Sequence, residues 1–387
     1  MDDVYEAAED SFMLQKHIKD YAKGRTLDMG TGSGIQAIEA AEYAKQIVAA
    51  DINKKAINEA KKKRIKNIKF IHSDLFSKIK GKFDCIIFNP PYLPTEEMAK
   101  DIALDAGKKG YEIIVRFLEE CRPHLENDGV ILLLFSSLSR PEVILKKAEE
   151  LLLDYKLVDQ QHIFFEDLFV YEIRKSAILN EFESKKISGA RIFTHGKHGE
   201  IFTGKLRGEK VAIKMALTSQ FETHIQNEAK ILRRINKLSI GPKFLFSTGS
   251  YFAYNFIEGD FILDFLGKAT KAQARKVIRQ ILRQCRVLDQ HGLSKFEMTK
   301  PVKHIIVQKN NNAIMIDFER CKHTKKPKNV TQFCQFLISP QVAGNDKMGM
   351  NRKQIIDACK NYKKTPKNTL FKKLEKIVFN QNIFNYF

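Results

Sequence analysis

Hydrophobic positions in the first half of the chain form short apolar runs that alternate with amphipathic segments. Phe12, Leu14, Ile18 and Tyr21 recur at helical spacing and predict a helix, which Gly24 ends. Other apolar runs predict buried strands, and they cover residues 26–29, 47–51, 70–74, 84–88, 130–135 and 168–173. Because strands alternate with helices, we expect a mostly parallel, doubly wound α/β sheet with right-handed crossovers.

Polar residues follow the predicted strands at the edge where parallel sheets bind ligands. Gly30, Gly32 and Gly34 follow the first strand, where glycine permits a tight turn and lets backbone N–H groups approach a ligand. Asp51 ends the second strand, about 20 residues later, where a carboxylate can accept hydrogen bonds from both ribose hydroxyls. Asp74 ends the third strand and can accept one from an adenine amino group. Each acid alone is better explained by a helix cap or a surface ion pair, but the ordered series predicts a nucleoside-type cofactor.

The tetrapeptide Asn89-Pro90-Pro91-Tyr92 follows the apolar run 84–88. Proline cannot continue a sheet ladder, so the chain must leave the sheet here, at the end where ligands bind. The Asn89 side-chain oxygen and the Pro90 carbonyl are two acceptors for the N–H groups of a planar amide, which Tyr92 can cover. Methyl transfer to an amide nitrogen needs this orientation rather than prior loss of a proton. The alternatives are a proline-rich turn without a chemical role, and a nicotinamide dehydrogenase, which would explain the glycines but not the tetrapeptide.

The tetrapeptide and residues 28–34 together resemble the amino-group methyltransferases that use S-adenosylmethionine. Residues 4–12, 105–112 and 134–139 resemble further motifs of the archaeal and eukaryotic HemK-like release-factor glutamine methyltransferases, with Ala7 in place of the usual proline. The resemblance implies a Rossmann-like methyltransferase fold for the first half of the chain.

For the site, this resemblance implies cofactor contacts from Tyr5, Glu9 and Asp28 in addition to the glycines and acids named above. It also implies methylation of the Gln side chain in the Gly-Gly-Gln motif of a class I release factor. A small zinc-binding activator subunit is the implied partner, covering an apolar edge of the enzyme. Adenine methyltransferases share the tetrapeptide, so a nucleic-acid base is the alternative methyl acceptor.

Charge is divided unevenly along the chain. Residues 1–178 hold 27 Lys and Arg against 30 Asp and Glu, whereas residues 179–387 hold 39 against 16. The net charges of −3 and +23 argue for two domains and for an anionic partner of the second, such as the ribosome or another RNA. The alternative is a lysine-rich solvated surface. We expect a methyltransferase domain at 1–178, a polar linker at 179–189, a second domain at 190–345 and a basic helical extension at 346–387.

The second domain begins with a glycine-bearing hairpin over residues 196–204 and the strand motif Val211–Lys214. Protein kinases cover and hold nucleotide phosphates with such a hairpin and a strand lysine. Glu228 stands where the helical partner of Lys214 is expected, and Asp317 ends a predicted strand as a kinase metal ligand does. We therefore expect a compact bilobal, protein-kinase-like α+β domain that binds ATP and Mg²⁺. The alternative for Lys214 is a snorkelling strand lysine.

The segment where a kinase catalytic loop is expected departs from the usual pattern. Glu297 can serve as catalytic base, and His304 can stand beside Asp317 as a metal ligand where Asn is usual. Together with residues 327–333, this pattern resembles a RIO-like group of predicted archaeal Ser/Thr protein kinases. Neutral His is a poorer magnesium ligand than an Asn oxygen, so nucleotide binding is better supported than phosphoryl transfer. The alternative is an inactive kinase fold that docks the enzyme on the ribosome or the release factor.

Several other features bound the class of protein. No apolar run approaches the roughly 18 residues of a membrane span, and the acidic start lacks the apolar core of a secretory signal. The six cysteines have no metal-ligand spacing, which indicates reduced thiols and a cytoplasmic location. Apolar residues near the C-terminus predict a helix packed on the small lobe or on a partner; they are Leu370, Phe371, Leu374, Ile377 and Val378.

Overall fold

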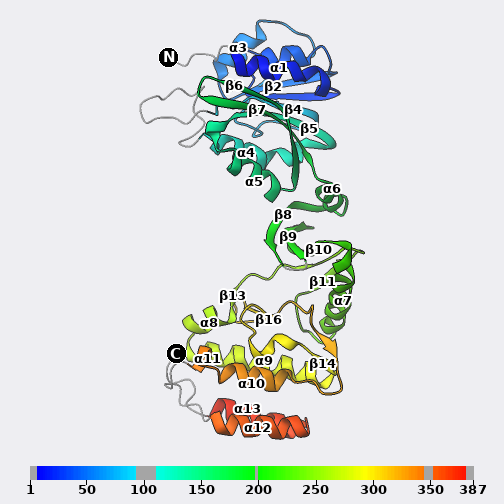
Figure 1. The fold of residues 1–387 in the computed structure, drawn as a ribbon, viewed down its shortest axis with the longest axis vertical. Helices are drawn as coiled ribbons and strands as arrows, with labels where there is room; N and C mark the ends of the chain where they lie inside the picture. The colour runs from blue at the N-terminus through cyan, green and yellow to red at the C-terminus, as the bar shows by residue number, and fades with distance from the viewer. Residues whose placement is uncertain (1–6, 93–109, 197–198, 344–351, 381–387) are drawn as a thin grey trace. The chain divides into compact units, whose positions relative to one another are not determined.

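The chain divides into two compact units, residues 1–192 and residues 193–387 (Figure 1). The computed structural model describes residues 7–92, 110–196, 199–343 and 352–380. In this described part of the chain, no helix is both long and apolar enough to span a membrane.

A seven-stranded sheet forms the centre of the first unit, in the order β3-β2-β1-β4-β5-β7-β6. The strands are β1 (Arg25–Met29), β2 (Gln46–Asp51), β3 (Ile68–His72), β4 (Phe83–Phe88), β5 (Leu125–Ser136), β6 (Leu153–Ile163) and β7 (Glu166–Lys175). β1 to β5 pair in parallel, and β7 and β6 continue the sheet as antiparallel strands. The predicted mostly parallel sheet is confirmed.

Helices cover both faces of this sheet (Figure 1). They are α1 (Glu9–Tyr21), α2 (Ile35–Ala40), α3 (Lys54–Lys61), α4 (Glu112–Cys121), α5 (Pro141–Glu150) and α6 (Ala177–Ser184), with short 3-10 turns η1 (Arg122–His124) and η2 (Ser137–Ser139). Leu14 and Ile18 of α1 belong to the same core cluster as Ile87 of β4. The next residue of β4, Phe88, points to the opposite face and lies 4.4 Å, ring centre to ring centre, from Phe117 of α4.

The order of the strands reverses at β1, which pairs with β2 on one side and β4 on the other. Met29 is in register with both Ala50 and Phe88. The glycine turn after β1 and the tetrapeptide after β4 therefore leave the sheet at neighbouring strand ends. A strand-order reversal of this kind is where doubly wound sheets bind ligands.

The first helix buries a different face from the one predicted. Leu14 and Ile18 are fully buried as expected, but the Phe12 side chain is 51% exposed. Asp10 and Ser11 are buried in its place, since residues three and four apart share a helix face with Leu14. This rotation turns two polar side chains toward the sheet.

The stretch predicted as a linker, residues 179–189, instead contains most of α6 and the start of β8 (Ile187–His195). Leu179 and Phe182 are buried one helical turn apart, and the Ser176 hydroxyl accepts the Leu179 N–H at 3.2 Å to cap the helix. The high density of charged residues hid this amphipathic pattern in the sequence.

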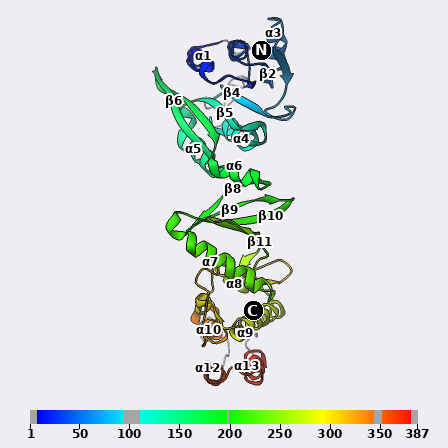
Figure 2. The ribbon, with the colours of Figure 1, turned by 90° about the vertical axis from the view of Figure 1, so that its right-hand side faces the viewer.

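The second unit has a five-stranded sheet in the order β11-β12-β10-β9-β8. The other strands are β9 (Gly199–Leu206), β10 (Glu209–Ala216), β11 (Phe244–Ser247) and β12 (Tyr251–Asn255). The long helix α7 (Ser219–Asn236) packs against β10, β11 and β12 (Figure 2). The predicted glycine hairpin lies between β8 and β9, where the Gly196 N–H donates to the Gly199 carbonyl; residues 197–198 are outside the described part.

The rest of the second unit is mostly helical and surrounds α9 (Lys271–Gln290), which Thr270 and Gln273 begin with a capping box. Its other helices are α8 (Ile262–Lys268), α10 (Asn329–Leu337), α11 (Pro340–Ala343), α12 (Arg352–Lys364), α13 (Asn368–Asn380) and η3 (Phe296–Thr299). Two small sheets complete it. One has three strands, β13 (Asp260–Phe261), β15 (Ile305–Val307) and β16 (Ala313–Met315), and the other has two, β14 (Leu293–Ser294) and β17 (Lys322–His323).

The predicted C-terminal helix is confirmed as α13, and within the chain it contacts α12 and α9. Leu374 is fully buried and, with Phe371, joins the cluster that contains Ile278 and Ile281 of α9. The helix therefore packs on the helical part of its own unit rather than on the five-stranded sheet, because α9 presents a matching apolar face.

We expect Leu374→Ala to destabilise the second unit by about 2–5 kcal/mol, because it leaves a cavity between α13 and α9. The measurement is the free energy of unfolding in urea. Lys373→Ala, at the exposed neighbouring position, is the matched control. Equal stability of the two variants would show that α13 does not depend on this contact.

Candidate active site

The first unit contains a cavity of about 400 Å³ at the carboxyl ends of its central strands. This volume is within the usual range for small-molecule sites. Seven of the predicted site residues line it: Gly30, Gly32, Asp51, Asp74, Asn89, Pro90 and Tyr92. Tyr5 lies outside the described residues, as do residues 105–109 of the loop that follows the tetrapeptide.

The glycine turn has positive φ angles at Gly30, Gly32 and Gly34, of 65°, 49° and 86°. A Cβ atom at Gly30 would lie 3.5 Å from the Phe88 ring and 3.8 Å from the Asn89 carbonyl oxygen. Both distances are ordinary van der Waals contacts, so the left-handed backbone conformation, rather than lack of space, favours glycine at this position.

Asp28 lies behind the glycine turn rather than on the cavity wall. Its Oδ2 accepts hydrogen bonds from the Thr31 hydroxyl at 2.6 Å and from the Ala37 N–H at 3.1 Å. Burial raises the pKa of this carboxyl to about 7. Asp28 therefore supports the turn, and the structure does not place it where a cofactor would touch it.

Asp51 joins the turn to the end of β2 and also lines the cavity. Its Oδ2 accepts the Gly32 N–H at 2.8 Å, and its Oδ1 accepts the Asn53 N–H at 2.7 Å. Burial raises the pKa of the carboxyl, against the opposing effect of these two hydrogen bonds. Each carboxylate oxygen has a second lone pair, so Asp51 can still accept from a ligand.

Asp74 lines the cavity beyond the end of β3 but already has a strong partner. Its two oxygens accept from the two terminal nitrogens of Arg116 on α4, at 2.9 and 2.8 Å. The sequence analysis missed this bidentate pair, because no local pattern connects Arg116 with Asp74. The ion pair fixes the carboxylate beside the cavity.

The hydrogen bonds of the Asn89 side chain are the feature of the cavity that bears most directly on its chemistry. Its Nδ2 donates to Asp10 Oδ2 at 2.9 Å, with the Ser11 hydroxyl at 3.5 Å. Its Oδ1 is buried and has no hydrogen-bond partner among the described residues. Because an ionised carboxylate can only accept hydrogen bonds, the contact with Asp10 specifies which end of the amide is the nitrogen. Asn89 lines the cavity, and its Oδ1 is the atom that can accept a hydrogen bond from a ligand.

The opening motif contributes Asp10 rather than the predicted Glu9. Glu9 is exposed and does not line the cavity, whereas Asp10 is 4% exposed and does. One helical step of about 100° separates the two side chains, so only one of them can face Asn89. The sequence Glu9-Asp10 indicated an acidic site residue in the opening motif. The rotation of α1 determines that this residue is Asp10.

Gln36 is a second cavity residue that the sequence analysis missed. Its Nε2 donates to the Ser11 carbonyl at 2.8 Å, and its buried Oε1 has no partner within the described ranges. A polar residue between Ile35 and Ala37 at the start of α2 was the available signal. The cavity thus has two buried carbonyl oxygens that can accept from a ligand.

The tetrapeptide is tied to the neighbouring strand by Ser139. The Ser139 hydroxyl donates to the Tyr92 carbonyl at 2.9 Å, and Ser136 and Ser139 form a capping box in η2 at the end of β5. Residues 134–139, which resemble the family's strand near the substrate cleft, therefore hold the tetrapeptide in position.

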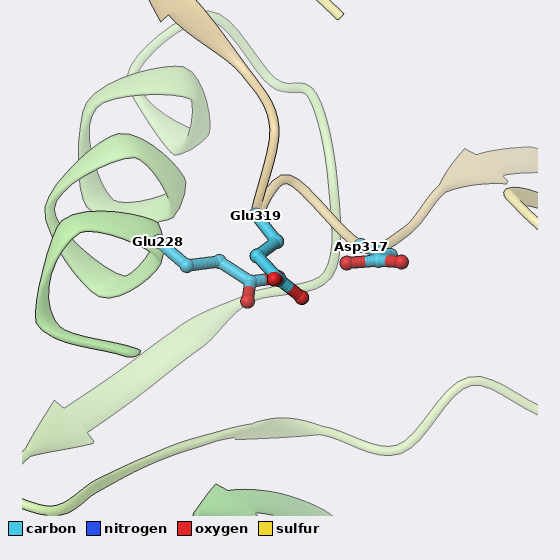
Figure 3. A group of neighbouring side chains, drawn as sticks. All are labelled: Glu228, Asp317 and Glu319. Atoms are coloured by element: carbon cyan, nitrogen blue, oxygen red, sulfur yellow. The ribbon is translucent and has the colours of Figure 1, made fainter. Parts of the chain in front are cut away.

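The second unit brings the predicted Lys214, Glu228 and Asp317 together. The Lys214 ammonium lies 2.7 Å from Glu228 Oε2, 3.1 Å from Asp317 Oδ1 and 3.6 Å from Glu319 Oε2. Burial opposes its charge, but the Glu228 and Asp317 carboxylates outweigh this and hold the pKa of Lys214 above its ordinary value. Figure 3 shows the Glu228 and Glu319 carboxylates close together, with Asp317 to one side.

The three carboxylates have oxygen atoms within 4.8 Å of one another. Glu319 was not predicted as a site residue. Asp317 has a positive φ of 59°, and the Phe318 N–H donates to Glu228 Oε1 at 2.9 Å. This backbone bend turns the side chain of Asp317 toward Lys214.

Glu297 and His304 lie near the same centre, where Lys295 contacts both Glu297 and Asp317. Lys295 is fully buried; its ammonium donates to the Asp317 carbonyl and lies 3.5 Å from Glu297 Oε2. His304 Nδ1 lies 3.6 Å from Asp317 Oδ2. Burial and then Lys295 lower the pKa of His304, which favours the neutral, metal-binding form. The sequence analysis missed Lys295.

Comparisons with known proteins concern mainly the first unit. The family model of the methyltransferase small domain matches residues 7–164. A Methanocaldococcus jannaschii protein with the provisional name protein N5-glutamine methyltransferase is 41% identical over 177 residues, which are 43% of this chain and 90% of that protein. The release factor glutamine methyltransferase of Lactococcus lactis is 34% identical over 136 residues, so the chain spans half the length of that relative.

Two solved structures are similar in part. One is a chain of the E. cuniculi Mtq2–Trm112 complex, responsible for methylation of the eRF1 translation termination factor, with 25% identity and a TM-score of 0.39 over 46% of this chain and all of that chain. The other is WbdD bound to a kinase inhibitor, with 14% identity and a TM-score of 0.42 over 96% of this chain and 88% of that chain.

The raised pKa of Asp28 leads to a prediction for stability. The native carboxyl keeps its proton up to about pH 7, whereas the unfolded chain releases it near 3.8. Between these values the native state binds more protons, so the free energy of unfolding should fall as the pH rises. The expected contribution is on the order of 4 kcal/mol.

Asp28→Asn should remove this part of the pH dependence. The measurement is urea unfolding of the first unit at several pH values between 4.5 and 8, for the wild type, Asp28→Asn and the exposed control Asp128→Asn. The assignment is contradicted when all three proteins lose stability equally as the pH rises.

Proposed function

The chain belongs to the methyltransferase small domain family, with protein glutamine methyltransferases among its relatives, and we propose that it methylates a protein glutamine with S-adenosylmethionine. The observation that carries this proposal is the buried, unpartnered Oδ1 of Asn89, whose amide is oriented by Asp10. An acceptor held in this way at a strand end suits an N–H donor of a substrate amide.

The cavity residues fit the cofactor. The glycine turn permits close approach of a ligand to the backbone, Asp51 can accept from ribose hydroxyls, and Gln36 Oε1 offers a further acceptor. S-adenosylmethionine supplies a methyl group on a positively charged sulfur. The acids around the cavity favour this positive charge.

The residues of the tetrapeptide position the nucleophile. Asn89 Oδ1 and the Pro90 carbonyl would accept the two N–H bonds of the glutamine amide, which directs the nitrogen toward the methyl group. These two acceptors stabilise the positive charge that develops on the nitrogen, and the excess proton then leaves to solvent. Tyr92, whose carbonyl is held by Ser139, would cover the planar amide.

For the substrate, we propose the glutamine of the Gly-Gly-Gln motif in a class I release factor. The names of the bacterial relatives support a release factor, and the resemblance of residues 4–12 and 134–139 supports the archaeal and eukaryotic group. That resemblance extends the proposal to a small zinc-binding activator subunit. A nucleic-acid adenine is the alternative acceptor.

We expect Asn89→Ala to lower the rate of methyl transfer by about 10²- to 10³-fold, because one of two acceptors for the reacting amide is lost. The measurement is mass spectrometry of a release factor incubated with the enzyme, activator and S-adenosylmethionine. Asn127→Ala, at an exposed position of β5, is the matched control. A methyl group found on RNA or DNA adenine instead would overturn the glutamine assignment.

A second proposal concerns the second unit. We propose that it binds ATP through Lys214, with Glu228 fixing the lysine. Asp317 and Glu319 provide hard oxygen ligands that suit Mg²⁺, and His304 stands near them. The resemblance to RIO-like kinases supports phosphorylation of protein Ser or Thr, with Glu297 as base. The alternative is an inactive kinase fold that serves as a docking module.

We expect Lys214→Met to weaken ATP binding roughly 10- to 100-fold, because a charged hydrogen bond to phosphate contributes about 1.5–3 kcal/mol. Lys210→Met is the matched control, since Lys210 lies on the same face of β10 but pairs with Glu258. The measurement is calorimetric titration with Mg-ATP. Equal binding by both variants contradicts the proposal. ATP turnover that is lost in Asp317→Ala indicates a kinase, whereas absence of turnover indicates a docking module.

A further inference from the structure

A basic groove runs along α9 in the second unit. It has a volume of about 470 Å³ and is lined by Ala272, Arg275, Lys276, Arg279, Gln280 and Arg283. These positions are three and four residues apart, so they form one stripe on the helix. From Arg275 to Arg283 the stripe extends about 12 Å. This α9 groove shares no residue with the centre around Lys214.

Contacts with α13 hold the arginines of the groove in place. Arg275 donates to the Phe379 carbonyl at 2.6 Å, and the Arg279 guanidinium lies 4.4 Å from the centre of the Phe379 ring. Arg283 Nε lies 3.1 Å from Glu375 Oε1. Guanidinium groups fixed in this way lose less conformational entropy when they bind an anion.

The turn between β15 and β16 borders the other side of the stripe. Lys276 donates to the Asn310 carbonyl at 3.4 Å, and Gln280 donates to the Asn311 carbonyl at 2.9 Å. The lining residues thus lie between two rigid elements, α13 and this turn, and do not depend on an unsupported loop.

Positive charge in the α9 groove exceeds negative charge. The carboxylate of Glu375 pairs with Arg279 and Arg283, and its side chain is 19% exposed. Arg279 and Arg283 are 41% and 62% exposed, so their charge faces solvent. Lys372 and Lys376 are exposed and lie one turn before Glu375 and Phe379, which adds two cations on the same side of α13.

The chemistry of the groove favours a polyanion with regularly spaced charges. Arginine forks match phosphate oxygens, and a stripe of this length meets several successive phosphates rather than one. An anionic membrane is a poorer fit, because a helix at a membrane surface needs an exposed apolar face. Val277, Ile278 and Ile281 of α9 are at most 4% exposed and are packed in the core.

We propose that the α9 groove binds the phosphate backbone of a nucleic acid. The groove contributes four cations to the positive charge of residues 193–387, which hold 36 Lys and Arg against 14 Asp and Glu. It contributes to binding of an extended strand without reading its sequence, since the lining residues are suited to phosphates rather than base edges. Methyl transfer and ATP binding do not depend on it.

The test is fluorescence anisotropy of a labelled single-stranded 20-nucleotide RNA with the full chain at several salt concentrations. We expect the double variant Lys276→Gln/Arg283→Gln to bind at least about tenfold more weakly at low salt. The slope of log affinity against log salt should fall by about 1.4, for two lost phosphate contacts. Lys237→Gln/Lys243→Gln, which removes two exposed lysines outside the groove, should bind as the wild type does.

A second pair, Lys372→Gln/Lys376→Gln, leaves the contacts between α9 and α13 intact and should weaken RNA binding in the same direction. Circular dichroism checks folding, and methyl transfer to the release factor should be unchanged in all groove variants. Equal affinity of groove and control variants overturns the proposal. Binding to vesicles with 30% phosphatidylserine, with none to RNA or to DNA of the same length, overturns it in favour of a membrane.

Discussion

The hydrogen bond between Asn89 and Asp10 is the constraint on which the first unit's site depends. A primary amide can face a cavity with either its oxygen or its nitrogen, and only its partners decide which. Asp10 accepts at 2.9 Å from a buried position, and a bond to a charged group of this kind contributes about 1.5–3 kcal/mol. A flipped amide would place two oxygens against each other, so the bond orients the acceptor before any ligand arrives.

The fold of the first unit brings these two side chains together. Asn89 comes from the switch point of the sheet, where β1 has neighbours on both sides and the glycine turn leaves room beside the tetrapeptide. Asp10 comes from α1, whose position follows from burial of Leu14 and Ile18 against the sheet. Ser139 fixes the far end of the tetrapeptide to β5. Apolar packing thereby positions a polar contact from residues that are far apart in the sequence.

The centre around Lys214 in the second unit differs from the cavity of the first unit in how its buried polar groups are paired. In the cavity of the first unit, Asn89 Oδ1 and Gln36 Oε1 have no partner among the described residues, whereas in the second unit three carboxylates surround the charge of Lys214. A buried ammonium is costly without such partners, so this centre is stable only when α7, β10 and the segment after β16 assemble. Lys295 adds a second buried cation that holds the Asp317 backbone.

The sequence by itself determined the parallel sheet, the glycine turn, the tetrapeptide and the acids at the strand ends, because these depend on short-range periodicity and on residues that break strands. It also determined that Lys214, Glu228 and Asp317 belong to one centre, through motif spacing. Only the tertiary structure decided that Asp10 rather than Glu9 faces Asn89, that Asp28 supports the turn from behind, and that Gln36, Arg116 and Lys295 join these sites. The physical reason is that each of these outcomes depends on the rotation of a helix or on a pairing across many residues, and packing sets both.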